Sequence, residues 1–206
     1  MPNIDNFTLF LTAAVILAIT PGPGIFYVLT RSIRGGRREG LASALGTSAG
    51  GMVHVVAAAL GLSVLLATSA LAFGLVKYAG AAYLIYLGIQ TLRQRGDPRT
   101  LSPAAVSRSA FFQGVTTEVL NPKTALFFLA FIPQFVSSTS PVVMQFLLLG
   151  SLSVLLNTLV DLVVIGLAGP VGRWLANSRA RRRQQQASGW MLIGLGAYVA
   201  IAPADR

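Results

Sequence analysis

Apolar residues lie along this chain in long runs, separated by short polar or basic segments. A helix needs about 20 apolar residues to cross a bilayer core about 30 Å thick. The pattern predicts six such helices, at residues 7–29, 41–66, 71–92, 110–132, 143–168 and 188–202. The run from 41 to 90 carries no formal charge except Lys77 and is too long for one span, so we divide it near Thr68 and Ser69.

These spans predict an all-α integral membrane protein that forms one membrane domain over residues 1–206. Three spans in each half would start the second half on the opposite side of the membrane, so we expect two inverted three-helix repeats. No basic residue precedes the first apolar run, unlike in a secretory signal peptide, and we interpret this run as a retained span.

Arginine residues gather in three of the segments between the spans. The loops predicted at 30–40, 93–109 and 171–187 hold 4, 4 and 5 Arg, which is 13 of the 16 bases in the chain. The loops after the second and fourth spans hold no base. Because cytoplasmic loops of membrane proteins carry the excess of Lys and Arg, we predict that these three loops face the cytoplasm and that both termini face outward.

Composition agrees with the membrane assignment. Hydrophobic residues make up 54% of the chain and charged residues 11%, against about 25% charged in a typical soluble domain. The net charge of +10 is spread over short clusters between apolar runs, so we interpret the arginines as topology signals and contacts for lipid head groups. We expect no nucleic-acid partner and no cofactor. The absence of cysteine excludes disulfides and cysteine-based metal sites.

Two spans contain residues that interrupt a helix. Pro21, Gly22 and Pro23 lie inside the first span, with another glycine after them. Prolines remove backbone donors from a helix, and prolines clustered with glycines favour a break rather than a mere kink. Freed backbone groups in lipid must be satisfied by protein or water. A break at this depth therefore indicates a cavity.

The fourth span is interrupted by Asn121, Pro122 and Lys123. It holds the same place in the second half that the first span holds in the first half. Interrupted helices in corresponding places are a sequence indication of a transporter binding site. We expect the two breaks to face one cavity, in which half-helix N-termini suit a substrate carboxylate and Asn121 orients the substrate.

Three charged residues are predicted at membrane depth: Glu118, Lys123 and Asp161. Ionisable groups in spans are costly and usually mark a path for ions or substrate. Asp161 or Glu118 could hold a substrate ammonium group and exchange it for a proton. Alternatively, Glu118 and Lys123 pair and neutralise each other. Lys77 lies near the outer end of its span and is expected to extend towards water.

Gly46, Gly50 and His54 recur every four residues and share one helix face. Small residues at this spacing let helices approach closely, either inside the bundle, between subunits, or both. A lone histidine is more often a packing or hydrogen-bonding residue than a ligand. The sites predicted from sequence are as follows. Substrate binding is assigned to Pro21, Gly22, Pro23, Gly50, His54, Asn121, Pro122 and Lys123, and ion coupling to Asp161 and Glu118.

Taken in order, these motifs resemble the LysE/RhtB family of amino-acid exporters over nearly the whole chain. The matching pieces are the Pro-Gly-Pro at 21–23, the segment 46–54, the sequence from Lys77 to Gly88, Asn-Pro-Lys at 121–123 and Pro-Gln-Phe at 133–135. The glycine-rich last span also fits. The segments 93–108 and 171–187 match only in length and basic character.

The resemblance implies secondary active export of amino acids or close analogues, driven by the proton or potential gradient across the bacterial inner membrane. It is also compatible with a homo-oligomer. The alternatives are an exporter of a metal ion or another small metabolite, a membrane-embedded enzyme, and a passive channel. One histidine and no cysteine give poor ligands for a metal ion. No Ser-His-Asp spacing, HExxH or paired aspartates indicate an enzyme.

Overall fold

The computed structural model describes residues 4–20, 22–68, 70–93, 109–137, 140–170 and 178–201, and these segments are helical with no strand among them. The elements are α1 (Ile4–Ile19), α2 (Pro23–Thr68), α3 (Ala70–Arg93), α4 (Ala110–Val119), α5 (Pro122–Leu126), η1 (Phe127–Phe131), η2 (Ile132–Phe135), α6 (Val142–Gly166) and α8 (Ser178–Ile201). The run α5–η1–η2 is one continuous helical rod whose middle turn is a π-helix and whose last turn is a 3₁₀-helix.

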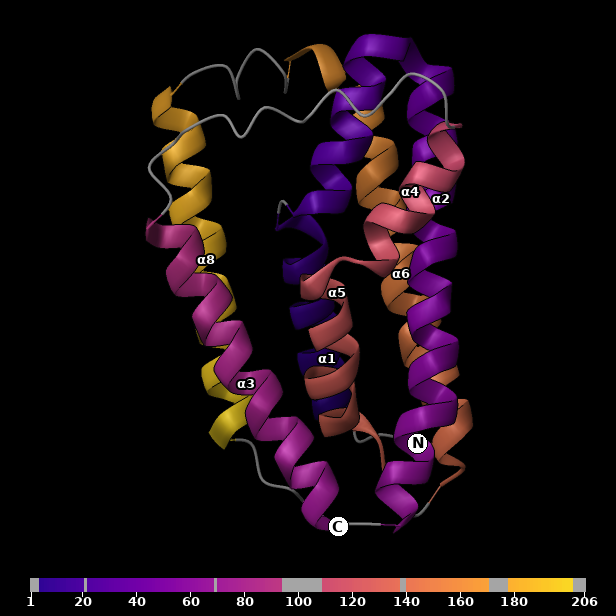
Figure 1. The fold of residues 1–206 in the computed structure, drawn as a ribbon, viewed down its shortest axis with the longest axis vertical. Coiled ribbons are helices and arrows are strands. Elements are labelled where there is room, and N and C mark those ends of the chain that lie inside the picture. The colour runs from indigo at the N-terminus through magenta and orange to yellow at the C-terminus, as the bar shows by residue number, and fades with distance from the viewer. Residues whose placement is uncertain are drawn as a thin grey trace.

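The chain reverses direction within α2. Gly36 has φ 70° and ψ −170°, a backbone conformation open essentially to glycine alone. The two arms of α2 run from this turn at the upper end of the molecule in Figure 1. Arg31 and Glu39 form an ion pair of 3.2 Å across the turn.

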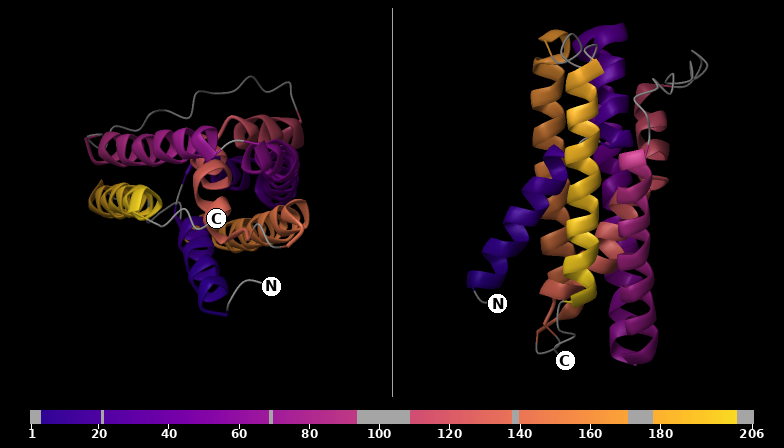
Figure 2. Two further views of the ribbon diagram at one scale, coloured as in Figure 1. Left: turned by 90° about the horizontal axis from the view of Figure 1, so that it is seen from below. Right: turned by 90° about the vertical axis from the view of Figure 1, so that its left-hand side faces the viewer.

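The helices form two groups around a central rod (Figure 2, left). On one side α3 packs along α8, and on the other side α2 packs against α4 and α6. The rod of α5, η1 and η2 lies between the groups, and α1 contacts both α6 and η2. A buried aromatic core occupies the part of the rod beyond α5, where the ring centroids of Phe131 lie 5.0 Å from Phe127 and 4.8 Å from Phe135.

Glycines allow the closest helix contacts. A Cβ atom on Gly114 of α4 would lie 2.6 Å from the carbonyl oxygen of Ser43 and 3.0 Å from the Cα of Gly46 in α2. Gly50 is equally close to α4, where a Cβ would lie 2.8 Å from the Val115 carbonyl oxygen. The predicted small-residue face therefore packs inside the chain, against α4.

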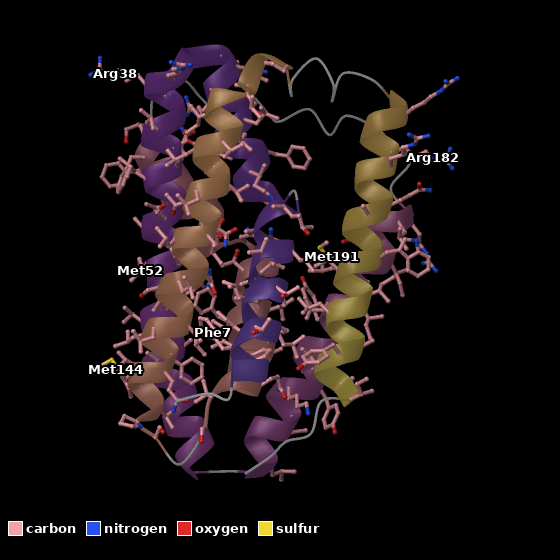
Figure 3. The ribbon with its side chains drawn as sticks, turned by 180° about the vertical axis from the view of Figure 1, so that it is seen from behind. Phe7, Arg38, Met52, Met144, Arg182 and Met191 are labelled. Atoms are coloured by element: carbon pink, nitrogen blue, oxygen red, sulfur yellow. The ribbon has the colours of Figure 1, made fainter. Side chains whose placement is uncertain are left out.

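Arginines from two of the basic segments lie at one end of the molecule. Arg38, next to the Gly36 turn, and Arg182, in the first turns of α8, both appear at the upper end of Figure 3. Phe7 in α1 and Met144 in α6 lie towards the other end (Figure 3). Helix α1 begins and α8 ends towards that second end (Figure 1).

By length and composition alone, two of the described helical stretches qualify as membrane spans: Pro23–Gly61, which contains the turn at Gly36, and Val142–Gly166. The pair Ala110–Val119 and Pro122–Phe135, bent by 45°, makes a third if it is one span. Shorter apolar helices cover Phe7–Ile19 and Gly189–Ile201. The protein is therefore an all-α membrane protein, while the number of six spans stays a prediction.

Two of the segments predicted as loops are partly helical. The loop predicted at 171–187 is helical from Ser178, because arginine and glutamine are good helix formers and the last helix continues beyond its apolar part. Likewise the loop predicted at 30–40 is helical on both sides of Gly36. Most of the loop predicted at 93–109 lies outside the described residues.

Lys77 also differs from its prediction. Its side chain is 2% exposed, with Nζ 5.5 Å from the centroid of the Tyr78 ring. The lysine is enclosed by protein because the side of α3 that carries it faces other helices rather than the outside of the bundle. It therefore does not extend outward to water.

Candidate functional site

The first span is broken at Thr20–Gly22. Helix α1 ends at Ile19, and α2 begins at Pro23, a residue that suits the first turn of a helix because it needs no amide partner there. Gly22 and Pro23 are placed as predicted at this break, whereas Pro21 lies outside the described residues. The last carbonyl groups of α1 have no partner within their own helix, so other groups must satisfy them.

The fourth span is broken at Leu120–Asn121. Asn121 caps α5, since its side-chain oxygen accepts a hydrogen bond of 3.1 Å from the backbone amide of Lys123, and Pro122 occupies the first turn. These are the preferred residues for a helix start. The sequence Asn-Pro thus ends one helix and starts the next at an angle of 45° to it.

Lys123 joins the two breaks. Its ammonium nitrogen donates to the carbonyl oxygens of Leu17, at 3.1 Å, and Thr20, at 2.9 Å. These carbonyls form the C-terminal end of α1, where the helix dipole favours a positive charge. A Cβ on Gly22 would lie 3.3 Å from Lys123 Cε, so glycine leaves the lysine room to pass. Segments about a hundred residues apart therefore meet at membrane depth.

Glu118 lies beside Lys123 but does not pair with it. Its Oε2 accepts from the Asn121 amide at 3.1 Å and its Oε1 from the Thr124 hydroxyl at 2.6 Å. In the described part of the chain no carboxylate comes within ion-pair distance of Lys123. The alternative of a neutralising Glu118–Lys123 pair is wrong. Lys123 binds helix carbonyl oxygens instead of Glu118, and Glu118 binds neutral side chains instead of Lys123.

Asp161 lies across the cavity on α6. The side chain is 5% exposed, and its Oδ2 accepts from the Thr47 hydroxyl of α2 at 3.0 Å. Thr47 also lies 2.9 Å from the Ala44 carbonyl oxygen, and its one hydroxyl hydrogen serves one acceptor at a time. A second hydroxyl pair, Ser48 and Thr158 at 2.7 Å, links the same two helices.

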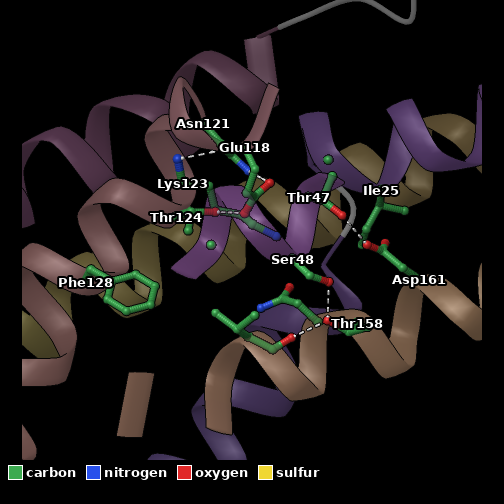
Figure 4. Close-up of a pocket in the computed structure, with 14 residues that line it drawn as sticks. Ile25, Thr47, Ser48, Glu118, Asn121, Lys123, Thr124, Phe128, Thr158 and Asp161 are labelled. Atoms are coloured by element: carbon green, nitrogen blue, oxygen red, sulfur yellow. Dashed lines mark hydrogen bonds between the residues drawn. The ribbon is translucent and has the colours of Figure 1, made fainter. Parts of the chain in front are cut away.

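These groups surround one cavity (Figure 4). Thr47 and Asp161 lie on one side of it, and Glu118 and Asn121 lie on the other. The lining residues are Gly24, Ile25, Thr47, Ser48, Gly51, Glu118, Asn121, Lys123, Thr124, Phe128, Val154, Asn157, Thr158 and Asp161. The space open to the centres of water-sized spheres is about 30 Å³, which suits about two water molecules. In this conformation the cavity is too small for an amino acid.

Of the residues predicted for the site, Glu118, Asn121, Lys123 and Asp161 line the cavity. Five others are described but are not among its lining residues: Gly22, Pro23, Gly50, His54 and Pro122. His54 Nε2 lies 3.0 Å from the carbonyl oxygen of Glu118 and its ring stacks on Phe128 at 5.9 Å, which is a packing and hydrogen-bonding role. A Cβ on Gly50 would lie 2.8 Å from the Glu118 Cβ, so this glycine lets α2 lie close to α4. Both residues therefore pack against Glu118 without lining the cavity.

Sequence reasoning missed the neutral polar side chains of the cavity. Thr47, Ser48, Asn157 and Thr158 line it from α2 and α6. The sequence could have indicated them. Thr158 and Asp161 are three residues apart, and Thr47 and Ser48 lie within the small-residue segment. Polar side chains one helical turn from a buried charge share its face.

The family of the chain follows from comparison with known proteins. The model of the family described as LysE type translocator matches residues 15–202. The chain belongs to this family. It is a translocator rather than an enzyme, and its relatives include amino-acid efflux proteins. The family match covers both breaks and all the charged residues of the cavity.

Three relatives of this LysE family translocator illustrate the range of likeness. An uncharacterized membrane protein of Vibrio cholerae is 35% identical over 98% of this chain and 100% of its own length. The homoserine/homoserine lactone efflux protein of Salmonella typhimurium is 33% identical over 94% of this chain and 95% of its own. The leucine efflux protein of Salmonella choleraesuis is 31% identical over 68% of this chain and 67% of its own. No solved structure matches significantly.

Metal-binding side chains are not gathered in the described part of the translocator. No group of three or more His, Cys, Asp and Glu residues there could hold a metal ion. The polar groups of the cavity are instead carboxylates, one ammonium group, hydroxyls and amides. These are the groups that bind small zwitterionic or cationic organic molecules.

Proposed function

We propose that this translocator is a secondary active exporter of amino acids or close analogues across the bacterial inner membrane, driven by the proton or potential gradient. The meeting of two broken spans at a cavity with buried charges carries the proposal. Interrupted helices at the middle of a membrane are the usual construction of a transporter site. The relatives exporting homoserine, homoserine lactone and leucine make these compounds the first candidates.

Alternating access is the mechanism that fits the arrangement. The two broken spans run in opposite directions along the molecule (Figure 1), as in halves related by a twofold axis in the membrane plane. The buried aromatic core around Phe131 continues the rod beyond Phe128, which lines the cavity. Rocking of one half against the other would open the cavity to each side in turn.

Coupling to protons is assigned to the two buried carboxyl groups. Asp161 or Glu118 would pair with the ammonium group of the substrate and would take a proton when the substrate leaves. A charge at this depth is costly unless it is compensated. In the loaded cavity the substrate ammonium group compensates the carboxylate, and in the empty cavity a proton would neutralise it instead. This exchange would use the inward proton gradient to drive export.

Export from intact cells tests the proposal. Cells expressing the protein and control cells are loaded with dipeptides containing leucine or homoserine, and the amino acids in the medium are measured over time. Faster appearance of one amino acid than in control cells is expected, and it should fail when the proton gradient is collapsed. If the expressing cells released each amino acid no faster than the control cells, the result would count against export of these amino acids. The homo-oligomer expected from the family stays a prediction.

A further inference from the structure

We infer that the cavity recognises its substrate through a primary ammonium group and offers no ionic partner to a substrate carboxylate. Amines whose carboxyl group is blocked as an ester, lactone or amide are then bound at least as well as the free amino acids. The inference rests on the proposed function, because it concerns the substrate of the same cavity. It departs from the sequence expectation that half-helix N-termini hold a carboxylate.

The lysine of the cavity is already paired. Lys123 directs two of its three hydrogens to the carbonyl oxygens of Leu17 and Thr20, and its charge lies at the negative end of the α1 dipole. One hydrogen remains, and a carboxylate could take the place of the two carbonyl oxygens only by breaking those bonds. The Leu17 carbonyl oxygen would keep its hydrogen bond of 3.2 Å from the Thr20 backbone amide, but the Thr20 carbonyl oxygen would lose its ammonium partner at membrane depth, which is costly.

A side-chain oxygen of this chain also lies close to each half-helix N-terminus. The Glu118 carboxylate lies against the first turn of α2, since a Cβ on Gly24 would come within 2.6 Å of Oε2. The side-chain oxygen of Asn121 caps α5. Each place where a helix dipole would favour a substrate carboxylate therefore already faces a protein oxygen.

The remaining charge in the cavity is negative. Of its lining residues, Glu118 and Asp161 carry carboxyl groups and Lys123 carries the one ammonium group. Glu118 has hydrogen bonds on both oxygens, whereas in the described residues Asp161 accepts its hydrogen bond, from Thr47, on Oδ2 alone. A buried cavity with two carboxylates and one lysine is completed by one further positive charge, and electrostatic attraction in low dielectric is strong. An ammonium group beside Asp161 supplies that charge.

Equilibrium binding to the full chain in lipid nanodiscs tests the inference, by titration calorimetry at a pH below the pKa of every amine used. Leucine, leucinamide and 4-methylpentanoate share a side chain. Leucine carries both the amine and the carboxylate, leucinamide carries the amine alone, and 4-methylpentanoate carries the carboxylate alone. Homoserine, homoserine lactone and 4-hydroxybutanoate form the matching polar series. We expect the amine-only compounds to bind as tightly as the amino acids, or up to about tenfold tighter, and the carboxylate-only compounds not to bind.

Two outcomes overturn the inference alone: binding of a carboxylate-only compound, or binding of an amino acid with its amine-only partner more than about tenfold weaker. If no compound of either series binds, the proposed function fails for these substrates as well. In Asp161→Asn, leucinamide should lose more affinity than leucine. In Lys123→Met, weaker binding of leucine with unchanged binding of leucinamide would show that the lysine holds the carboxylate, against the inference.

Discussion

At the scale of single residues, the translocator keeps its charges apart rather than pairing them. Lys123 is held by backbone carbonyls, Glu118 by an amide and a hydroxyl, and Asp161 by a hydroxyl. Neutral partners satisfy each charged group without cancelling its charge. The charge of the two carboxylates thus stays available to a cationic ligand, whereas a Glu118 paired directly with Lys123 would be neutralised.

Asp161→Asn tests the coupling group. Asparagine has the same size and still accepts a hydrogen bond from Thr47, so the fold and its thermal stability should be kept. It cannot change charge, so export should fall by about tenfold or more and lose its dependence on pH. Initial export rates across a range of pH measure both effects. Glu39→Gln makes the same chemical change outside the cavity and is the control. Unchanged export at every pH would remove Asp161 from the coupling role.

Gly46→Ala tests the contact between α2 and α4. A Cβ at this position would collide with the Phe111 carbonyl oxygen and lie 3.0 Å from the Gly114 Cα, so the helices must separate. Overpacking of this kind costs about 1–3 kcal/mol, and the melting temperature of the purified protein should fall. Gly61→Ala lies in the same helix with nothing within 4 Å and should leave the melting temperature the same or higher. Equal effects of the two substitutions would contradict the close contact.

At the scale of helices, the breaks and the turn decide where the charged groups lie. Asn121 and Pro122 start α5 where α4 has ended, and Gly36 turns α2 back on itself. Each of these features depends on a residue with an unusual backbone requirement or capping group. Their effect is to direct α2, α4, α5 and α6 to the same cavity.

Gly36→Ala tests the turn in α2. No atom lies within 4 Å of a Cβ built there, so the cost comes from the backbone conformation alone and should be about 1–3 kcal/mol. Gly166→Ala, which also has open space around its Cβ but no positive φ, is the matched control. Thermal unfolding of both variants measures the difference, and the turn would be under no constraint if both melted alike.

Sequence alone predicted the breaks but not what they contact. Proline beside glycine or asparagine marks an interrupted helix, and the structure has breaks at both places. The partners of Lys123 are backbone carbonyls, which every residue has, so no residue type could indicate them. The start of α8 was missed for a related reason, because hydropathy marks the apolar part of a helix and not its polar extension.

At the scale of the whole molecule, Arg38 and Arg182 lie at the opposite end (Figure 3) from the start of α1 and the end of α8 (Figure 1). This separation is what a protein with an even number of spans and basic cytoplasmic turns requires. It supports the proposal that both termini face outward.

Single cysteines test this orientation, since the chain has none of its own. In whole cells, a membrane-impermeant thiol reagent should modify Ser140→Cys, which precedes α6 at the end opposite to the arginines. Arg38→Cys and Arg182→Cys should react only after the membrane is opened. The reverse pattern would invert the proposed topology, and modification of all three in intact cells would show that the membrane does not separate these ends.

The bond between Lys123 and α1 also sets an order on biosynthesis. The carbonyl oxygens of Leu17 and Thr20 are made first, yet their partner follows 106 and 103 residues later. At about 5–20 residues per second, ribosomes need roughly 5–20 seconds to reach it. During that interval the end of α1 cannot rest in lipid without cost. Helix α1 therefore reaches its final contacts only after Lys123 has been synthesised, and we expect its C-terminal end to stay near water or the insertion machinery until then.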